Sequence, residues 1–193
     1  MKPAALSILA TLIAAAPAAL FAPALAAETI AVAPFKSIEV HGGGHVVLRH
    51  GDTQRVTLLK GDRKIAEIRV DGDGALLLSP CSGMCWGNHE LEVEVVTPAI
   101  AGLSAHGGGE IDAKPGFGTQ PRLAIEAHGG GEIDARNIPA ADVTATVHGG
   151  GEVELRAEKH LNAEVHGGGE LRYWGHPSVS SDIHGGGSVE SGD

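Results

Sequence analysis

The sequence predicts an all-β fold, a parallel β-helix (β-solenoid) with coils of about 18–22 residues and glycine-rich corners. The segment His-Gly-Gly-Gly occurs six times, and its last five copies follow at nearly constant intervals, starting at His106, His128, His148, His166 and His184. Between the copies, apolar and polar residues alternate with period two, which is typical of strands. A repeat of this kind predicts a stack of similar units, each burying its apolar face on the next.

The alternation predicts which side chains face the core. In the segment around the fifth copy, Leu161, Leu171 and Tyr173 are expected to point inward. Residues expected to stack inside are Val147, Val165 and Ile183, and those expected outside are His148, His166 and His184. Three successive glycines allow a sharp corner with positive φ angles. If these corners stack, Gly149, Gly167 and Gly185 should lie in line, with neighbouring Cα atoms about 4.8 Å apart.

The N-terminal segment 1–26 reads as a signal peptide. Lys2 precedes a long run of Ala, Leu and Ile, and Ala24-Leu25-Ala26 offers small residues for cleavage before Ala27. A retained membrane anchor is the alternative, but Pro17 and Pro23 interrupt the run. No later segment is long and apolar enough to span a bilayer. The sequence therefore predicts export, to the periplasm or the cell surface.

The rest of the chain, residues 27–193, is expected to form one domain. Residues 104–193 carry the regular His-Gly-Gly-Gly repeats, most of them followed by Glu. Residues 27–103 also alternate, but Gly-Asp turns separate their strands at irregular intervals. We interpret this part as about three looser coils that cap the N-terminal end, because terminal repeats are usually atypical.

The charge balance limits the partners. Without residues 1–26, which include Lys2, the chain has 13 basic and 24 acidic residues and a net charge of −11. Nucleic acids and anionic membranes attract basic surfaces, so neither is expected as a partner. Cations and cationic surfaces remain compatible with this composition. An unidentified envelope or surface component is the expected partner, and end-to-end pairing of copies of the chain is a further possibility.

The two cysteines, Cys81 and Cys85, lie in the segment Cys-Ser-Gly-Met-Cys. In an oxidising compartment they are expected to form a local disulfide that closes a loop. The alternative is a redox or metal-binding pair, which usually has a Cys-x-x-Cys spacing or further soft ligands.

The repeats also predict columns of chemically active side chains. Stacked strands would place the histidines of successive segments in one column and the following glutamates in another. Two imidazoles and a carboxylate suit Zn, Cu or Ni, although no cofactor is expected to be required. The candidate ligands are His128, His148, His166, Glu132, Glu152 and Glu170. The alternative is a surface pattern, in which neutral imidazoles stack without metal and the carboxylates maintain solubility.

The sequence resembles the bacterial "putative auto-transporter adhesin, head GIN domain" family (DUF2807). The resemblance rests on Phe35-Lys36-Ser37-Ile38-Glu39-Val40, on Val46-Val47-Leu48 and on Leu171-Arg172-Tyr173-Trp174-Gly175-His176-Pro177. It implies an exported protein with a right-handed, parallel β-helix-like fold, and it supplies no catalytic residues. The family usually has Gly-Ser-Gly turns where this chain has His-Gly-Gly-Gly-Glu, so the His and Glu columns are a departure from its pattern.

No Ser-His-Asp arrangement, P-loop or HExxH motif is apparent, so an enzyme is not expected. The preferred hypothesis is an exported, non-enzymatic structural or binding module of the cell envelope, similar to an adhesin. The first alternative is a periplasmic divalent-metal-binding protein that uses the His and Glu columns. The second is a carbohydrate-active β-helix, which would need a groove lined by aromatic side chains.

Overall fold

The computed structural model describes residues 27–82 and 89–193, and it is all-β over these ranges. Its fifteen strands belong to one sheet. The first seven are β1 (Glu28–Ile30), β2 (Ser37–Gly42), β3 (Gly44–His50), β4 (Arg55–Lys60), β5 (Glu67–Val70), β6 (Ala75–Ser79) and β7 (Leu91–Thr97). The others are β8 (Gly102–Gly107), β9 (Glu110–Ala113), β10 (Gln120–Gly129), β11 (Glu132–Gly149), β12 (Glu152–Gly167), β13 (Glu170–Trp174), β14 (Ser178–Gly185) and β15 (Ser188–Ser191).

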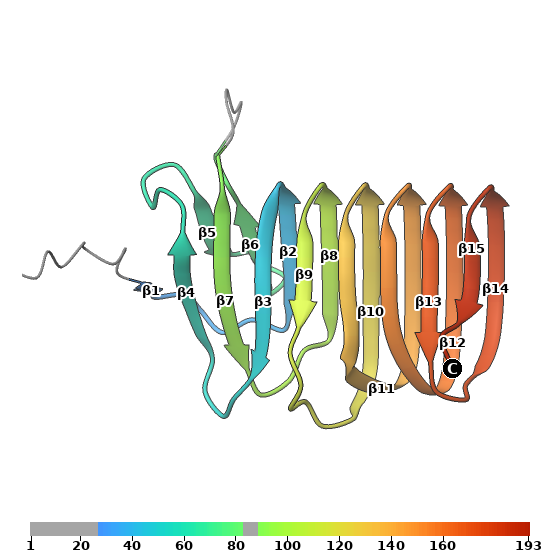
Figure 1. Cartoon of the computed structure of the whole chain (residues 1–193). Coiled ribbons are helices and arrows are strands. Elements are labelled where there is room, and N and C mark those ends of the chain that lie inside the picture. The colour runs from blue at the N-terminus through green and yellow to red at the C-terminus, as the bar shows by residue number, and fades with distance from the viewer. Residues whose placement is uncertain (1–26, 83–88) are drawn as a thin grey trace, which may run out of the picture.

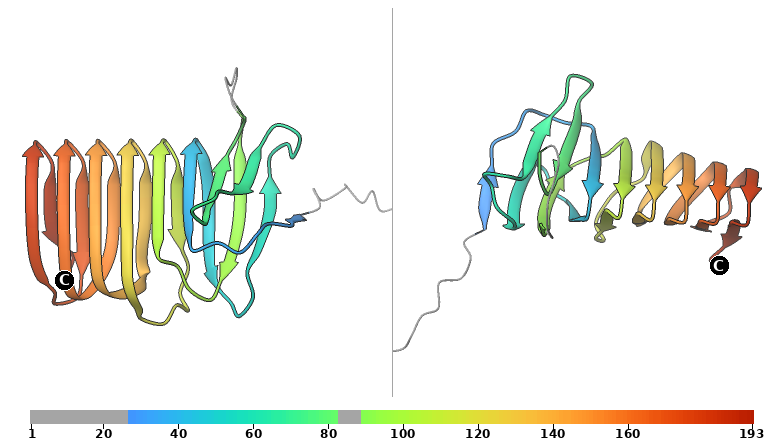
Figure 2. Two further views of the ribbon diagram at one scale, coloured as in Figure 1. Left: turned by 180° about the vertical axis from the view of Figure 1, so that it is seen from behind. Right: turned by 90° about the horizontal axis from the view of Figure 1, so that it is seen from above.

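The sheet curls back on itself to form two facing walls (Figures 1 and 2). One wall contains β2, β8, β10 and β14, and the other contains β7, β3, β9, β13 and β15. The long strands β11 and β12 contribute their first residues to the second wall and their last residues to the first. Two edges of the sheet, at β1–β4 and at β5–β6, lie at the N-terminal end of the molecule, and β14 and β15 form the edges at the other end (Figure 1).

The predicted parallel β-helix is therefore wrong as a description of the fold. The chain forms a mixed, barrel-like sheet that nearly closes, in which β1 pairs with β4, β4 with β7, and β5 with β6 in antiparallel fashion. The turn between β5 and β6 shows the physical reason. The Gly74 amide donates to the carbonyl of Asp71 at 2.9 Å, closing a tight turn that reverses the chain. Such a turn joins antiparallel neighbours, whereas parallel neighbours need a long crossover.

The predicted alignment of the His-Gly-Gly-Gly segments is confirmed as a local feature. Gly149 pairs with Gly167, and Gly167 pairs with Gly185, in parallel register. Here the strand in the opposite wall supplies the crossover that parallel neighbours require. Segments at these positions therefore lie side by side although each is separated from the next by a full repeat of the sequence.

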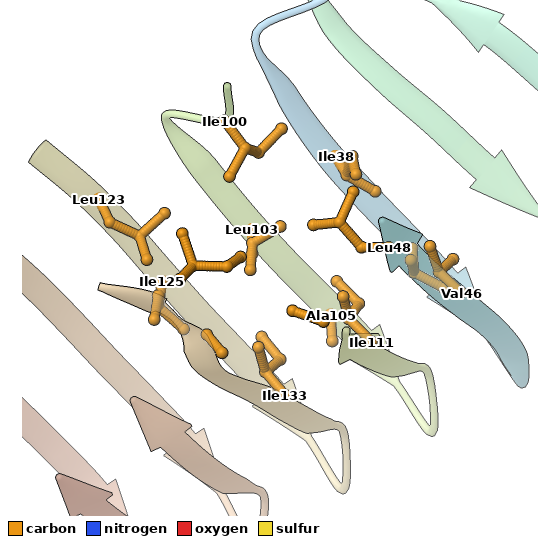
Figure 3. Packing of buried hydrophobic residues seen from close by; sticks show 14 of the residues in the cluster. Ile38, Val46, Leu48, Ile100, Leu103, Ala105, Ile111, Leu123, Ile125 and Ile133 are labelled. Atoms are coloured by element: carbon orange, nitrogen blue, oxygen red, sulfur yellow. The ribbon is translucent and has the colours of Figure 1, made fainter. Parts of the chain in front are cut away.

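The core lies between the walls and is almost entirely aliphatic. Leu103, Ile125 and Ile133 come from three different strands and point into the same space (Figure 3). The predicted inward residues Val147, Val165, Leu161 and Leu171 are all buried. Three polar residues among the described ranges are also buried, and these are Thr57, Thr97 and Gln120.

Two predicted core positions are not fully covered. Ile183 pairs with Val165 and so shares its orientation, but it is 41% exposed. Tyr173 is half-buried at the edge of the core. Ile183 is exposed because it lies in β14, which pairs only with β12. No further described strand covers that end of the core.

Glycine lets the chain turn and pack closely at each corner. The first glycine of every His-Gly-Gly-Gly segment has a positive φ, from 73° at Gly42 to 130° at Gly185. A Cβ at Gly167 would lie 2.6 Å from the carbonyl oxygen of Gly149, and one at Gly151 would lie 2.7 Å from that of Gly131. The middle glycines Gly150 and Gly168 have no such neighbour within 4 Å among the described residues. The first and third positions therefore require glycine, and the middle position does not.

Two sequence predictions fall partly or wholly outside the described residues. The signal peptide, residues 1–26, is one of them. The predicted disulfide is the other, since Cys85 lies in the segment that is not described, while Cys81 is buried next to the end of β6. Both stay predictions. No helix in the described ranges is long and apolar enough to cross a membrane.

The geometry of the corner predicts that alanine destabilises the protein at the first glycine but not at the middle glycine. Gly167→Ala should lower the free energy of unfolding by about 1–3 kcal/mol, because alanine is strained at positive φ and its Cβ meets the Gly149 carbonyl. Gly168→Ala should change it by less than about 0.5 kcal/mol. Urea titrations of both variants measure the difference, and equal losses would contradict this reading of the corner.

Substitutions on the inward and outward faces of β12 should differ in their effect on stability. Val165→Asp places an unpaired carboxylate in the aliphatic core and should lower the free energy of unfolding by at least about 3 kcal/mol. His166→Ala, at the adjacent outward position, should cost less than about 1 kcal/mol. The same titration applies, and comparable losses for the two variants would mean that the faces are assigned incorrectly.

Candidate functional site

Six histidines form one continuous column on the outside of the first wall. They precede the glycine corners of six neighbouring strands and are His41, His106, His128, His148, His166 and His184. We call this set the histidine column. Adjacent ring centroids lie 4.7 to 5.0 Å apart, close to the spacing between paired strands. The sequence predicted the five later members, and pairing of His41 with His106 adds the first.

The rings are not equally parallel along the column. In the middle they stack nearly face to face, with interplanar angles of 7° for His106–His128, 16° for His128–His148 and 8° for His148–His166. At the two ends the angles open to 34° for His41–His106 and 31° for His166–His184. The side chains at the ends are therefore oriented differently from those in the middle.

Some of the histidines contact a carboxylate two positions earlier on the same strand. Glu39 Oε1 lies 2.5 Å from His41 Nε2, and Glu126 Oε2 lies 3.9 Å from His128 Nε2. Period two places residues i−2 and i on the same face of a strand, so this signal was available in the sequence and was missed. Ser104 pairs with both Glu39 and Glu126, which separates the two carboxylates by one strand.

The predicted glutamate column also forms, but on the second wall. Glu132 pairs with Glu110 and Glu152, and Glu152 pairs with Glu170. We call these four residues the glutamate column. His45 Nε2 lies 3.7 Å from Glu110 Oε1 at one end, and Arg172 binds Glu170 at the other. His45 is a neighbour that sequence reasoning did not include.

Glu132 and Glu152, in the middle of the glutamate column, have no ion-pair partner among the described residues. By contrast, the next outward positions are neutralised by arginine. Arg136 lies 2.6 Å from Asp134 and 3.0 Å from Glu154, and its guanidinium lies 5.2 Å from the centre of the Trp174 ring. Negative charge is therefore left uncompensated at Glu132 and Glu152.

The pKa shifts follow this arrangement. Burial, together with the neighbouring charges of Glu110 and Glu152, raises the pKa of Glu132. Burial would also raise the pKa of Asp134, but hydrogen bonds from Arg136 outweigh it and hold that pKa below its usual value. On the histidine wall, burial and the adjacent His41 lower the pKa of His106.

The predicted metal ligands are not brought together as one group. His128, His148 and His166 belong to the histidine column, whereas Glu132, Glu152 and Glu170 belong to the glutamate column in the other wall. Among the described residues, one group of three possible ligand atoms lies within 4.8 Å of one another. That group consists of Glu39, His41 and His106, none of which was among the predicted metal ligands.

The family model described as "Putative auto-transporter adhesin, head GIN domain" (DUF2807) matches residues 34–116 and 115–177. The chain belongs to this family. The matched ranges include strands of both walls, apart from β14 and β15, and five of the six His-Gly-Gly-Gly segments. The resemblance seen in the sequence is thereby confirmed. No curated protein matches the sequence.

One solved structure, of low sequence identity, has the same fold class. A putative adhesin from Bacteroides fragilis is 19% identical, with a TM-score of 0.50 over 86% of this chain and 96% of that chain. A putative adhesin from Parabacteroides distasonis has a TM-score of 0.39 at 19% identity, over 86% of this chain and 96% of that chain. A putative lipid binding protein from the same species has a TM-score of 0.35 at 16% identity, over 87% of this chain and 96% of that chain. At 19% identity, the similarity to the Bacteroides fragilis structure shows the fold alone.

The pKa of Glu132 predicts how its charge affects stability. A carboxylate with a folded-state pKa above its unfolded value opposes folding once ionised, so Glu132→Gln should raise the melting temperature at neutral pH. The gain should disappear below about pH 4, where the carboxylate is protonated in both states. It should also shrink in about 1 M salt.

Glu126→Gln is the matched control, because Glu126 is exposed and its paired neighbours Ser104 and Thr146 carry no charge. Differential scanning calorimetry across this pH range measures both variants. A gain at Glu126 equal to that at Glu132 would show that neither the burial of Glu132 nor repulsion within the glutamate column is the cause.

Proposed function

We propose that this GIN-domain chain is an exported, non-enzymatic binding module of the cell envelope. The observation that carries the proposal is the outer face of the second wall, where Glu132 and Glu152 are held side by side without a basic partner among the described residues. Such a face attracts cationic groups and costs stability when it is left alone. Retaining it is consistent with a binding role for a positively charged envelope or surface component.

A non-enzymatic role is supported by where the polar groups lie. The described core is aliphatic, and its three buried polar residues are two threonines and a glutamine. Catalytic acids and bases generally need a sheltered site, and here the carboxylates and imidazoles are spread along open strand faces. The arrangement suits extended contact with a surface better than enclosure of a small substrate.

The carbohydrate-active alternative has weaker support. A hollow of about 590 Å³ lies near the N-terminal end, with His45, Lys60 and Glu90 in its lining. Glu90 is occupied by an ion pair with Lys60 at 2.6 Å. The described lining includes no Phe, Tyr or Trp, the side chains on which sugar rings usually pack.

Export is tested by producing the full chain in a Gram-negative host. The expected result is a processed protein that begins at Ala27 and is recovered from the periplasm or the cell surface. Mass spectrometry of the purified protein and cell fractionation give the two readouts. An intact N-terminus at Met1 together with cytoplasmic recovery would contradict the proposal.

Binding is tested with the purified protein and isolated envelope fractions from the same host. The double variant Glu132→Gln/Glu152→Gln should bind several-fold more weakly, because it removes the uncompensated charges, and binding of the wild-type protein should fall with salt. The control Glu126→Gln/Glu164→Gln removes the same charge from the histidine wall and should bind like wild type. Equal binding by all three proteins would exclude the glutamate column as the binding face.

A further inference from the structure

We propose a transition-metal site at the N-terminal end of the histidine column, formed by Glu39, His41 and His106. This site is separate from the glutamate column and does not rest on the binding role proposed above. It also differs from the ligand set suggested by the repeats, because two of its three residues lie in or beside the first His-Gly-Gly-Gly segment.

Convergence of the ligand atoms is the first argument. The Nε2 atoms of His41 and His106 both face the same carboxylate oxygen, Glu39 Oε1, at 2.5 and 3.5 Å. All three ligand atoms lie within 4.8 Å of one another. Zinc bound to nitrogen and oxygen at about 2.1 Å in tetrahedral geometry places its ligands roughly 3.4 Å apart. Small side-chain rotations therefore suffice to admit an ion between these three atoms.

Ring tilt is the second argument, and it distinguishes this end from the middle of the column. Nearly parallel rings, such as His148 and His166 at 8°, hold their nitrogen lone pairs in nearly parallel planes about one strand spacing apart. One ion cannot bind two such lone pairs well. The 34° tilt between His41 and His106 is associated with nitrogens that approach a common point.

Support from the neighbours is the third argument. The His106 ring is stacked on His128 at 4.8 Å, which restricts its rotation. Glu39 and His41 are two positions apart on β2, and His106 is the direct partner of His41 on β8. The three side chains are about one-third exposed, at 30%, 41% and 33% for Glu39, His41 and His106. The site is thus held on paired strands and is open to an ion from solution.

The ligand set indicates the class of metal. Two imidazoles and one carboxylate suit Zn²⁺, Cu²⁺ or Ni²⁺, and they leave a coordination position for water. Ca²⁺ and Mg²⁺ prefer sites made from oxygen ligands. The other end of the column has a similar tilt, and His184 lies 3.4 Å from Asp182, but no third ligand joins them there within the described residues.

The test is calorimetric titration of the purified, metal-free protein with Zn²⁺, Cu²⁺ and Ni²⁺ at about pH 7.5, because metal binding by imidazole competes with protons at lower pH. The expected result is one ion per chain for at least one of these metals and no binding of Ca²⁺. Glu39→Gln and His41→Gln should each weaken binding by at least about tenfold, because each removes one of three ligands. Circular dichroism of the metal-free variants checks that both fold.

Two matched controls locate the ion. Glu126→Gln changes the equivalent carboxylate beside His128, and His148→Ala/His166→Ala disrupts the middle of the column; neither should alter the affinity. Absence of binding to the wild-type protein would overturn the proposal. So would binding that survives Glu39→Gln and His41→Gln, or that is lost in the His148→Ala/His166→Ala variant, since the column itself would then be the site.

Discussion

Close approach of the backbone at the glycine corners is the constraint on which the regular part of this structure depends. The amide of each middle glycine donates to the carbonyl of the first glycine in the preceding segment, for example Gly168 to Gly149 at 2.8 Å. The amide of the residue that follows the three glycines donates to the carbonyl of the third glycine in the preceding segment, for example Glu170 to Gly151 at 3.0 Å. Backbone hydrogen bonds therefore also join neighbouring segments within the corner, and a side chain at the first or third glycine would prevent this close approach. Only the middle position has room, which is consistent with the Gly-Ser-Gly turns that the family resemblance implied.

Once the corners are in register, the columns on both walls follow directly. Every side chain at an equivalent position lies one strand spacing from its neighbours, whether or not they attract each other. The chain resolves the resulting repulsion differently in each column. On the histidine wall, uncharged Ser104 and Thr146 flank Glu126, and the imidazoles stack. Glu164 and Asp182 are paired at the C-terminal end of this wall, where Asp182 lies 3.4 Å from His184. At Asp134 and Glu154, arginines neutralise the charge. Of these columns, the glutamate column keeps adjacent carboxylates in its middle without a basic partner in the described ranges, which is why we assign the binding role to it.

The two proposed sites use the same scaffold for different chemistry. The glutamate column presents negative charge over a long open face, which favours a broad cationic surface as its partner. The Glu39, His41 and His106 cluster brings three ligand atoms toward one point, which favours a single ion. The difference arises because His41 is an end member of the histidine column, where the rings tilt out of parallel, and Glu39 lies two positions before it on the same strand.

The sequence by itself determined the strand class, the inward and outward faces of residues 120–171, and the alignment of the His-Gly-Gly-Gly segments. These features are local or periodic: alternation assigns the faces, and a constant repeat length aligns equivalent residues. Tertiary structure decided the rest. A tight turn such as that at Gly74 sets antiparallel pairing in the N-terminal part, which overturned the parallel β-helix. Ile183 has the same sequence pattern as Val165 but lies where no described strand covers it. His41 reaches His106 only when β2 pairs with β8, and sequence reasoning missed this contact because that pairing closes a long loop of irregular length that has no periodic signal.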